Sequence, residues 1–469
     1  MYKITALTIA LIIFSSAISV NAIQDTSNIN INVNDDKEST LEGGYDLLIL
    51  TPKKFIRHIE PLICHKNKFG VKTILVDIED VYEQMYWHGR DDAEKVKYFI
   101  KKSIEEWGIK YVLLFGGRKN QRAPETWWIP VRYSYLDRKY DEFPEKRFLS
   151  DLYFADIYDK DGNFSSWDTN NNGIFGEWPE NEIAYDKPDL SPDVFVGRLP
   201  CRNILEVKVI VKKIIRYENG KRPDSWFKTM VVIAGDTYPL KTDYYDGEVY
   251  TQWGIDMMPG FNPVKLWASD GSFSGWKDVV REFSKGCGFI WFSGHGNPAS
   301  WATHPPDDEE TWITGMKLRH MFLLKNREKQ PVCITGSGCF NSMFNVSILN
   351  SPHVYGYSIP HCWSWALARK ISGGSIATIG ATAFSYESPD INLGFGGIEW
   401  LDMHFFEQYG LNNVDILGET WGNTIISFLQ NFTINWDDSS SDGYALIAKN
   451  VEQWLLIGDP SLKIGGYSV

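Results

Sequence analysis

The stretch PVCITGSGCFN, residues 331–341, combines a short apolar run with two glycines and a cysteine that follows the run directly. Such a run is typical of a buried strand, and the glycines allow the chain to turn sharply where the strand ends. The stretch GFIWFSGHG, residues 288–296, is built the same way and delivers His295 where the first delivers Cys339. The two stretches predict an open α/β sheet with a thiol and an imidazole at the carboxyl ends of its strands.

The same alternation of apolar runs and helical segments extends over most of the chain. Continuous apolar runs such as residues 110–117 are separated by segments of helical periodicity, and a second series of runs starts near residue 230. This pattern is typical of a parallel sheet covered on both faces by helices. Residues 222–225 (RPDS) divide the two series. We therefore expect an N-terminal α/β subdomain over residues 45–225 and a catalytic subdomain over residues 226–469.

The first 44 residues differ from the rest in composition. Lys3 is followed by an apolar run over residues 4–14 and by small residues that end at Val20-Asn21-Ala22. This order predicts a signal peptide over residues 1–22, with an uncleaved membrane anchor as the alternative. The run is shorter than the ~20 residues that a membrane span needs, and no later segment is a convincing span. Residues 23–44 are polar and predict a linker or short pro-segment. We therefore expect a secreted or cell-surface protein.

Composition excludes several classes of protein. The 469 residues include 47 Lys and Arg against 60 Asp and Glu, for a formal net charge of -13. A nucleic-acid-binding protein would need a basic face, so the charge argues against that class. Six cysteines occur without a CxxC pair. Their spacing argues against a zinc ribbon, and their number is too small for a disulfide scaffold.

The stretch DTNNNGIFGE, residues 168–177, has the oxygen pattern of a loop that wraps a hard cation. Asp168, Asn170 and Asn172 would offer side-chain oxygens, Ile174 its carbonyl, and Glu177 a late carboxylate. Glu177 arrives two residues earlier than in an EF-hand. We therefore expect a structural calcium ion in a loop that is not an EF-hand. The alternative is an Asn/Gly-rich surface turn that binds no metal.

Three candidate catalytic residues each follow an apolar run: Asp236, His295 and Cys339. A cysteine attacks as the thiolate, and a neighbouring histidine both activates it and returns a proton to the leaving group. The amides of Gly296 and Cys339 could stabilise an oxyanion, and Asp236 could orient His295. Each residue also has a simpler interpretation: Cys339 as an inert buried thiol, His295 as a loop histidine, and Asp236 as a turn or cap residue.

These motifs resemble the gingipain-type cysteine peptidases, peptidase family C25 of the caspase–hemoglobinase-like clan. The resemblance runs from about residue 45 to residue 469, and the order of the motifs is more specific than any one of them. The matching pieces are YVLLFGG (111–117), the D-x-N-x-N-G loop, DVFVGRLP (193–200), FSGHG (292–296), GSGCF (336–340) and GDPSL (458–462).

The resemblance implies a caspase-like α/β fold with two side-by-side, mostly parallel sheets and helices on both faces. It implies that Cys339 is the nucleophile, that His295 is the general base and acid, and that Asp236 is the acidic partner of the histidine. It also places Ser337 and Tyr386 in the wall of the substrate pocket. Family members that are specific for basic residues carry an acid in this pocket, and in this chain Tyr244, Asp246 or Glu248 could occupy the position.

The sequence therefore predicts an exported cysteine endopeptidase that acts on polypeptides through an acyl-enzyme. One alternative is a transpeptidase of the same fold, in which an amine replaces water. Another is a non-catalytic, calcium-stabilised module at the cell surface. The preference for the residue before the cleaved bond, P1, stays open at this level.

Overall fold

The computed structural model describes residues 44–122, 125–136, 145–220, 224–239, 242–349, 358–388, 391, 396–441 and 443–467. The expected signal peptide and nearly all of the polar segment lie outside these residues, so neither is tested. Residues 43–469 cluster into one compact unit. No described helix is both long and apolar enough to span a bilayer.

The main sheet of the described chain has ten strands. In chain order they are β1 (Leu47–Thr51), β2 (Thr73–Asp77), β3 (Tyr111–Phe115), β6 (Phe195–Leu199), β7 (Thr229–Ala234), β8 (Asn262–Trp267), β9 (Phe289–Phe292), β13 (Val332–Thr335), β14 (Ala377–Ala381) and β15 (Trp454–Ile457). Their order across the sheet is β2-β1-β3-β6-β15-β14-β13-β9-β7-β8. All neighbouring pairs are parallel except β14 and β15. The predicted mostly parallel α/β architecture is confirmed.

Strand β15 joins the two halves of this sheet. It pairs parallel with β6 through Ile457 and Arg198, and antiparallel with β14 through four residue pairs. The strands of the first half therefore run opposite to those of the second. The two expected sheets lie side by side as one continuous sheet, and a late segment of the chain fills the position between them.

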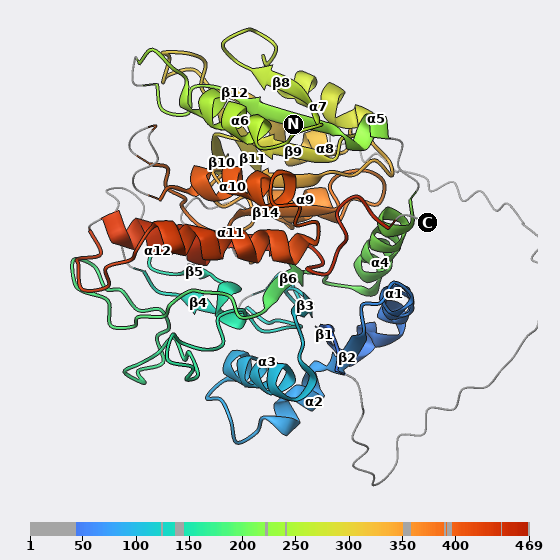
Figure 1. Cartoon of the computed structure of the whole chain (residues 1–469), viewed down its shortest axis with the longest axis vertical. Helices are drawn as coiled ribbons and strands as arrows, with labels where there is room; N and C mark the ends of the chain where they lie inside the picture. Colours follow the sequence, from blue (N-terminus) through green and yellow to red (C-terminus); the bar gives the residue numbers. More distant parts are fainter. Residues whose placement is uncertain are drawn as a thin grey trace, which may run out of the picture. The chain divides into compact units, whose positions relative to one another are not determined.

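Helices cover both faces of the sheet. Alternate residues of a strand point to opposite faces, so apolar side chains on both faces have to be covered. They are α1 (Ile56–Lys68), α2 (Ile78–Gln84), α3 (Asp92–Trp107), α4 (Ile204–Asn219), α5 (Asp224–Phe227), α6 (Asp246–Asp256), α7 (Trp276–Lys285), α8 (Leu318–Met321), α9 (Trp363–Ala368), α10 (Ile398–Gly410), α11 (Leu417–Asn431) and α12 (Gly443–Gln453), with short 3-10 turns at Lys53–Phe55 and Leu152–Phe154. Trp291 of β9 packs on Phe406 of α10, and the next residue, Phe292, packs on Trp363 of α9. In Figure 1, α11 and α12 cross the region where the two halves meet.

Local sequence explains some element ends and not others. Asn203 caps α4, since its side chain accepts a hydrogen bond from the Glu206 amide. Periodicity did not predict α2, α12, the pair β4 (Tyr133–Ser134) and β5 (Phe148–Leu149), or a small antiparallel sheet. That sheet consists of β10 (His295–Asn297), β11 (Ser300–Thr303) and β12 (Ile313–Lys317). Its strands are too short to carry a clear alternation.

Candidate active site

Two neighbouring strands deliver the histidine and the cysteine to the same edge of the sheet. Strands β9 and β13 pair in parallel, so the loops that follow them, residues 293–297 and 336–341, leave the sheet side by side. We call them the catalytic-pair loops. A Cβ atom added to Gly296 would lie 2.6 Å from the carbonyl carbon of Gly338, so only glycine permits this approach. The side chain of Asn341 also donates to the Asn297 carbonyl at 2.7 Å.

His295 is oriented by a backbone carbonyl. Its Nε2 lies 2.7 Å from the carbonyl oxygen of Thr237. A carbonyl can only accept, so Nε2 carries the hydrogen and Nδ1 is left as the basic nitrogen of the neutral ring. The rings of Tyr238 and Trp312 each lie 5.2 Å from the imidazole, in edge-on contacts. Burial, together with the nearby His304, lowers the pKa of His295, although the Thr237 contact opposes this shift.

Asp236 follows β7 as expected. The resemblance implied that its carboxylate is the partner of His295, and the structure gives the carboxylate a different contact. Its Oδ2 accepts a hydrogen bond from the amide of Asp307 at 2.9 Å. The Nε2 of His295 contacts the carbonyl of the next residue, Thr237, in place of a carboxylate. Burial raises the pKa of Asp236. In this geometry the group that orients His295 is a backbone carbonyl after the end of β7. A search of the sequence for acidic side chains does not find such a group.

Cys339 is half-buried and contacts the loop after β14. The Ser385 amide donates to its Sγ at 3.4 Å, and the Ser385 hydroxyl lies 3.4 Å from the same sulfur. Burial raises the pKa of Cys339, while the two Ser385 contacts lower it. A raised thiol pKa beside a lowered imidazole pKa favours a neutral pair when no ligand is bound. Ser385 was not among the residues expected from the sequence.

The expected oxyanion donors, the amides of Gly296 and Cys339, lie close together, but the Cys339 amide already has a hydrogen-bond acceptor. The Cys339 amide donates to the Ser337 carbonyl at 3.1 Å, within a tight turn. Gly296 lies in β10, opposite Trp301 of β11. Catalytic hydrogen bonds are often incomplete in a ligand-free enzyme and form only with the substrate. The turn at Cys339 would therefore have to change for its amide to face an oxyanion.

The two residues expected in the pocket wall have structural contacts. The buried Ser337 hydroxyl accepts from the Gly294 amide at 3.2 Å, which ties the catalytic-pair loops together. The Tyr386 backbone exchanges two hydrogen bonds with the side chain of Asn450. Lys449 lies 5.3 Å from the centre of the Tyr386 ring. Ser337 therefore holds the two catalytic-pair loops together. The half-buried Tyr386 ring lies beside the site.

Two of the residues offered for an acid in the pocket are carboxylates with protein donors. Asp246 accepts hydrogen bonds from the amides of Thr237, Tyr238 and Gly247. Glu248 accepts from both the amide and the hydroxyl of Ser269. The contacts of Asp246 hold the segment after β7 that carries Thr237, and those of Glu248 hold Ser269, which follows β8. Both acids therefore already have protein donors.

A third carboxylate, Glu387, lacks such donors. In the described part of the chain neither of its carboxylate oxygens, both buried, has a hydrogen-bond partner. Burial raises its pKa well above the usual range, and the nearby Asp246, Glu399 and Cys339 raise it further. Glu387 is thus an acid without a partner in the neighbourhood of the thiol. The sequence contained no local pattern that distinguished it from other acids.

Asp402 holds the turn that presents the cysteine. This fully buried residue of α10 accepts hydrogen bonds from the amides of Gly336 and Ser337, at 3.1 and 3.2 Å. It also accepts from the indoles of Trp291 and Trp454, at 3.3 and 2.9 Å. Burial raises its pKa to about 7 against the opposing effect of these donors. Four donors from two strands and one loop meet on this carboxylate, which in the sequence is only a lone acid in the apolar run WLDMHFF.

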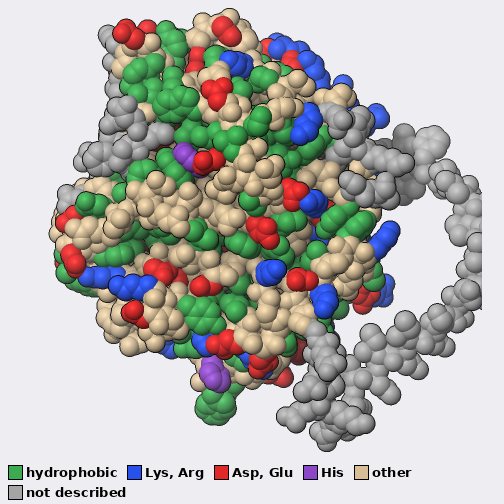
Figure 2. Space-filling model, in the orientation of Figure 1, with side chains coloured by type: hydrophobic (Ala, Val, Ile, Leu, Met, Phe, Trp, Pro, Cys, Tyr) green, Lys and Arg blue, Asp and Glu red, His purple; other side chains and the backbone are tan. Residues whose placement is uncertain are grey.

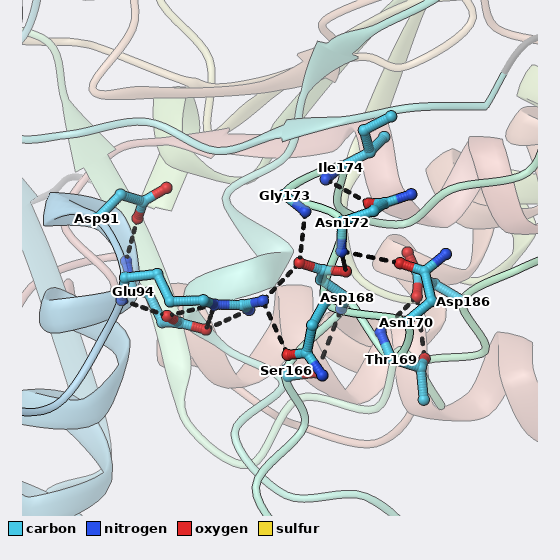
Figure 3. Close-up of polar contacts among 12 residues, drawn as sticks. Asp91, Glu94, Ser166, Asp168, Thr169, Asn170, Asn172, Gly173, Ile174 and Asp186 are labelled. Atoms are coloured by element: carbon cyan, nitrogen blue, oxygen red, sulfur yellow. Dashed lines mark hydrogen bonds and ion pairs between the residues drawn. The ribbon is translucent and has the colours of Figure 1, made fainter.

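The stretch at residues 168–177, which we call the Asp168 turn, forms the expected ladder of side-chain oxygens (Figure 3). Asn170 and Asn172 accept from backbone amides two residues further on. Asp168 accepts from the amides of Asn172 and Gly173, and its Oδ2 forms an ion pair with Arg90 at 2.5 Å. The amide nitrogens of Asn170 and Asn172 face Glu177, at 3.4 and 2.6 Å.

The donor set of this turn fits calcium by chemistry, because it combines carboxylate and amide oxygens. Arg90, however, already supplies a positive charge to Asp168. In the described chain no group of three or more His, Cys, Asp or Glu residues could hold a metal. Calcium would therefore compete with the Arg90 guanidinium for Asp168, and the Asn side chains would have to turn their oxygens inward.

Comparison with known proteins agrees with this geometry. The model of peptidase family C25 matches residues 40–465. The chain belongs to peptidase family C25. Gingipain R2 and gingipain R1 of Porphyromonas gingivalis are each 21% identical to it over 440 residues, or 89% of this chain. The chain spans 46% of the gingipain R2 sequence and 34% of that gingipain R1 sequence, which is less than half of either.

Solved structures confirm the C25 fold. A crystal structure of the Arg-specific cysteine proteinase gingipain R matches 90% of this chain and 78% of its own with a TM-score of 0.60, at 19% identity. A complex of the pro- and mature domains of RgpB from Porphyromonas gingivalis matches with a TM-score of 0.57, at 18% identity, over 89% of this chain and 79% of that one.

Proposed function

We propose that this C25 chain is a cysteine endopeptidase that hydrolyses peptide bonds through an acyl-enzyme. The observation that carries the proposal is the contact between the catalytic-pair loops, one with an imidazole oriented through Nε2 and the other with a half-buried thiol. Nothing else in the described chain combines a free thiol, a basic ring nitrogen and glycine-rich turns at one sheet edge. The matching gingipain R structure is that of a cysteine proteinase, which supports the same chemistry.

The chain's own residues can carry each proton in this reaction. The Nδ1 of His295 accepts the proton of Cys339 as the sulfur attacks the carbonyl carbon of the scissile bond. The amine leaves with the proton that His295 holds. Water then attacks the thioester, gives its proton to Nδ1, and releases the acid product and the free thiol. The Gly296 amide, joined by the Cys339 amide once its turn opens, stabilises the oxyanion of both tetrahedral intermediates.

Replacement of the thiol tests the mechanism directly. Cys339→Ala should abolish cleavage of a fluorogenic peptide library, while Cys64→Ala, at an exposed and distant cysteine, should leave it unchanged. Full activity of Cys339→Ala would refute the proposal. Product masses measured with an added amine would identify a transpeptidase. No turnover by the unaltered enzyme on any library would favour the non-catalytic module.

We also propose that the enzyme prefers a basic P1 side chain and that Glu387 receives it. Its carboxylate oxygens have no hydrogen-bond partner in the described chain, and it lies near the thiol. Because its pKa is raised, its carboxyl becomes charged only at a higher pH than that of an ordinary glutamate, and a bound cation stabilises the charged form. Binding of basic substrates should therefore strengthen as the pH rises. The matching gingipain R is an Arg-specific cysteine proteinase, which agrees with this preference.

A substitution at this acid tests the preference. Glu387→Gln should lower selectivity for Arg or Lys over neutral P1 residues by at least about thirtyfold. The matched variant Glu248→Gln, at an acid already engaged by Ser269, should preserve the selectivity. An unaltered enzyme without any basic preference would disprove this assignment, and it would not affect the proposal of a cysteine peptidase.

Export is a further part of the proposal and rests on the sequence of residues 1–22. Mass spectrometry of the mature protein should find a new N-terminus at residue 23. Retention of residues 1–22 would instead indicate a membrane anchor.

A further inference from the structure

A groove of about 1110 Å³ lies at the edge of the sheet opposite to the catalytic-pair loops. Its lining includes Ser225 just before β7, Lys285 at the end of α7 before β9, and Gln330 just before β13. His295 and Cys339 follow the other ends of β9 and β13. Since a strand advances about 3.3 Å per residue, four-residue strands separate the groove from the catalytic pair by at least roughly 13 Å. The groove is therefore a site of its own.

Positive charge is concentrated in this groove although the protein is acidic. Eight of its lining residues are basic and one is acidic, in a chain of net charge -13. Lys208, Lys212 and Arg216 follow one another at intervals of four on α4, so they share one helix face. The loop before β13 contributes three more basic residues: Lys325, Arg327 and Lys329. Figure 2 shows basic side chains gathered along the margin where Figure 1 places α4.

Few acids of the described chain neutralise these cations. Arg216 pairs with Glu328 at 3.4 Å, and both side chains are more than half exposed. Lys285 pairs with Glu282 at 2.5 Å. The described residues form no ion pair with the remaining exposed members, which are Lys208, Lys212, Lys325, Arg327 and Lys329. Cations held close together repel one another, and an anionic ligand converts that repulsion into attraction.

We propose that this groove binds a sulfated polysaccharide. The cations on α4 recur about every 6 Å along the helix, which suits a polymer with repeated charges more than a single small anion. Lysine outnumbers arginine by five to two among the exposed basic lining residues, since Lys213 is buried and donates to three backbone carbonyls. Lysine acts as a point charge, whereas arginine is preferred for bidentate recognition of phosphate in nucleic acids. Single-stranded nucleic acid would also require a series of stacked aromatic side chains, whereas the described lining has two aromatic residues, Trp226 and the buried Tyr217.

Binding of heparin, measured by calorimetry on the full chain, tests the proposal independently of peptidase activity. Lys208→Glu with Lys212→Glu should weaken heparin binding by at least about tenfold and reduce the slope of log K against log salt by about 2. The matched control Lys72→Glu with Lys160→Glu makes the same change in net charge at exposed lysines outside the groove, and it should retain the affinity. Circular dichroism of both variants establishes that they are folded.

Three results would overturn the proposal. One is the absence of heparin binding by the unaltered chain in dilute salt. Another is equal weakening by the groove variant and the control variant, which would indicate only non-specific attraction. The third is tighter binding of a single-stranded oligonucleotide or of poly-glutamate than of heparin at equal salt, which would assign the groove to a different class of partner.

Discussion

The catalytic-pair loops and the Asp168 turn were both identified by reactive side chains at fixed spacing, yet they differ in how those side chains are satisfied. In the loops, the Nδ1 of His295 stays available and the thiol has only weak contacts with Ser385. In the turn, Asp168 is held by two amides and by Arg90. Groups kept without strong partners are ready to act on a ligand, whereas groups with a full set of partners hold the chain in shape. The contrast assigns chemistry to the first region and stability to the second.

The largest effect that the comparison predicts is at His295. His295→Asn should lower kcat/KM by at least about a thousandfold, because no other group can then move the proton. In the unaltered enzyme the activity on substrates with a neutral P1 residue, which do not depend on the charge of Glu387, should be constant through neutral pH. It should fall only when the pH drops below the lowered pKa of His295, since protonation removes the base. A decline that begins above pH 6.5 on the acid side would contradict this assignment.

A second, smaller loss is expected at Asp402. Asp402→Asn places an amide nitrogen against some of the four N–H donors, so the turn before Cys339 should shift and kcat/KM should fall by about a hundredfold. Alkylation of Cys339 by iodoacetamide should slow in parallel, which a general loss of stability would not produce in a protein that remains folded. The control Glu407→Gln lies on the same helix and should behave like the unaltered enzyme. Normal alkylation in Asp402→Asn would contradict a positioning role.

In the Asp168 turn we expect the opposite result, a loss of stability with little change in activity. Asp168→Ala removes the acceptor for two amides and for Arg90, and it should lower the free energy of unfolding by about 1–3 kcal/mol. Its kcat/KM should stay within about twofold of the unaltered value, a bound that follows from the separation of the two regions. Urea unfolding and peptide cleavage measure the two quantities. Asp161→Ala, in the neighbouring exposed turn, is the control, and a loss of activity without a loss of stability would break the contrast.

Calcium should have the smallest effect. We propose that it binds the Asp168 turn weakly, because it has to displace the Arg90 guanidinium. Millimolar calcium should raise the melting temperature by about 1–3 °C relative to chelator. Arg90→Met should increase this shift, since it removes the competing cation. Identical melting curves with calcium and with chelator would show that the turn is satisfied by protein groups alone.

Sequence reasoning was sufficient where a signal is local. Apolar runs identified the strands, and glycines beside His295 and Cys339 identified the edge at which the loops meet. It was insufficient where a partner comes from far along the chain or from the backbone. The group that orients His295 is the Thr237 carbonyl, and every residue has a carbonyl. Asp402 lies in an apolar helix, and nothing local connected it to the amides 65 and 66 residues away that it accepts from.

Strand β15 has a consequence for biosynthesis. It lies between β6 and β14, and its Trp454 donates to the carboxylate that holds the cysteine turn. While the ribosome is still adding residues before 454, both neighbouring strands lack a partner on one side, and the nucleophile lacks one of its supports. Joining the two halves requires a pairing between residues that are far apart in sequence and therefore slow to meet. The proposed peptidase would thus acquire its complete site only after the last strand is inserted.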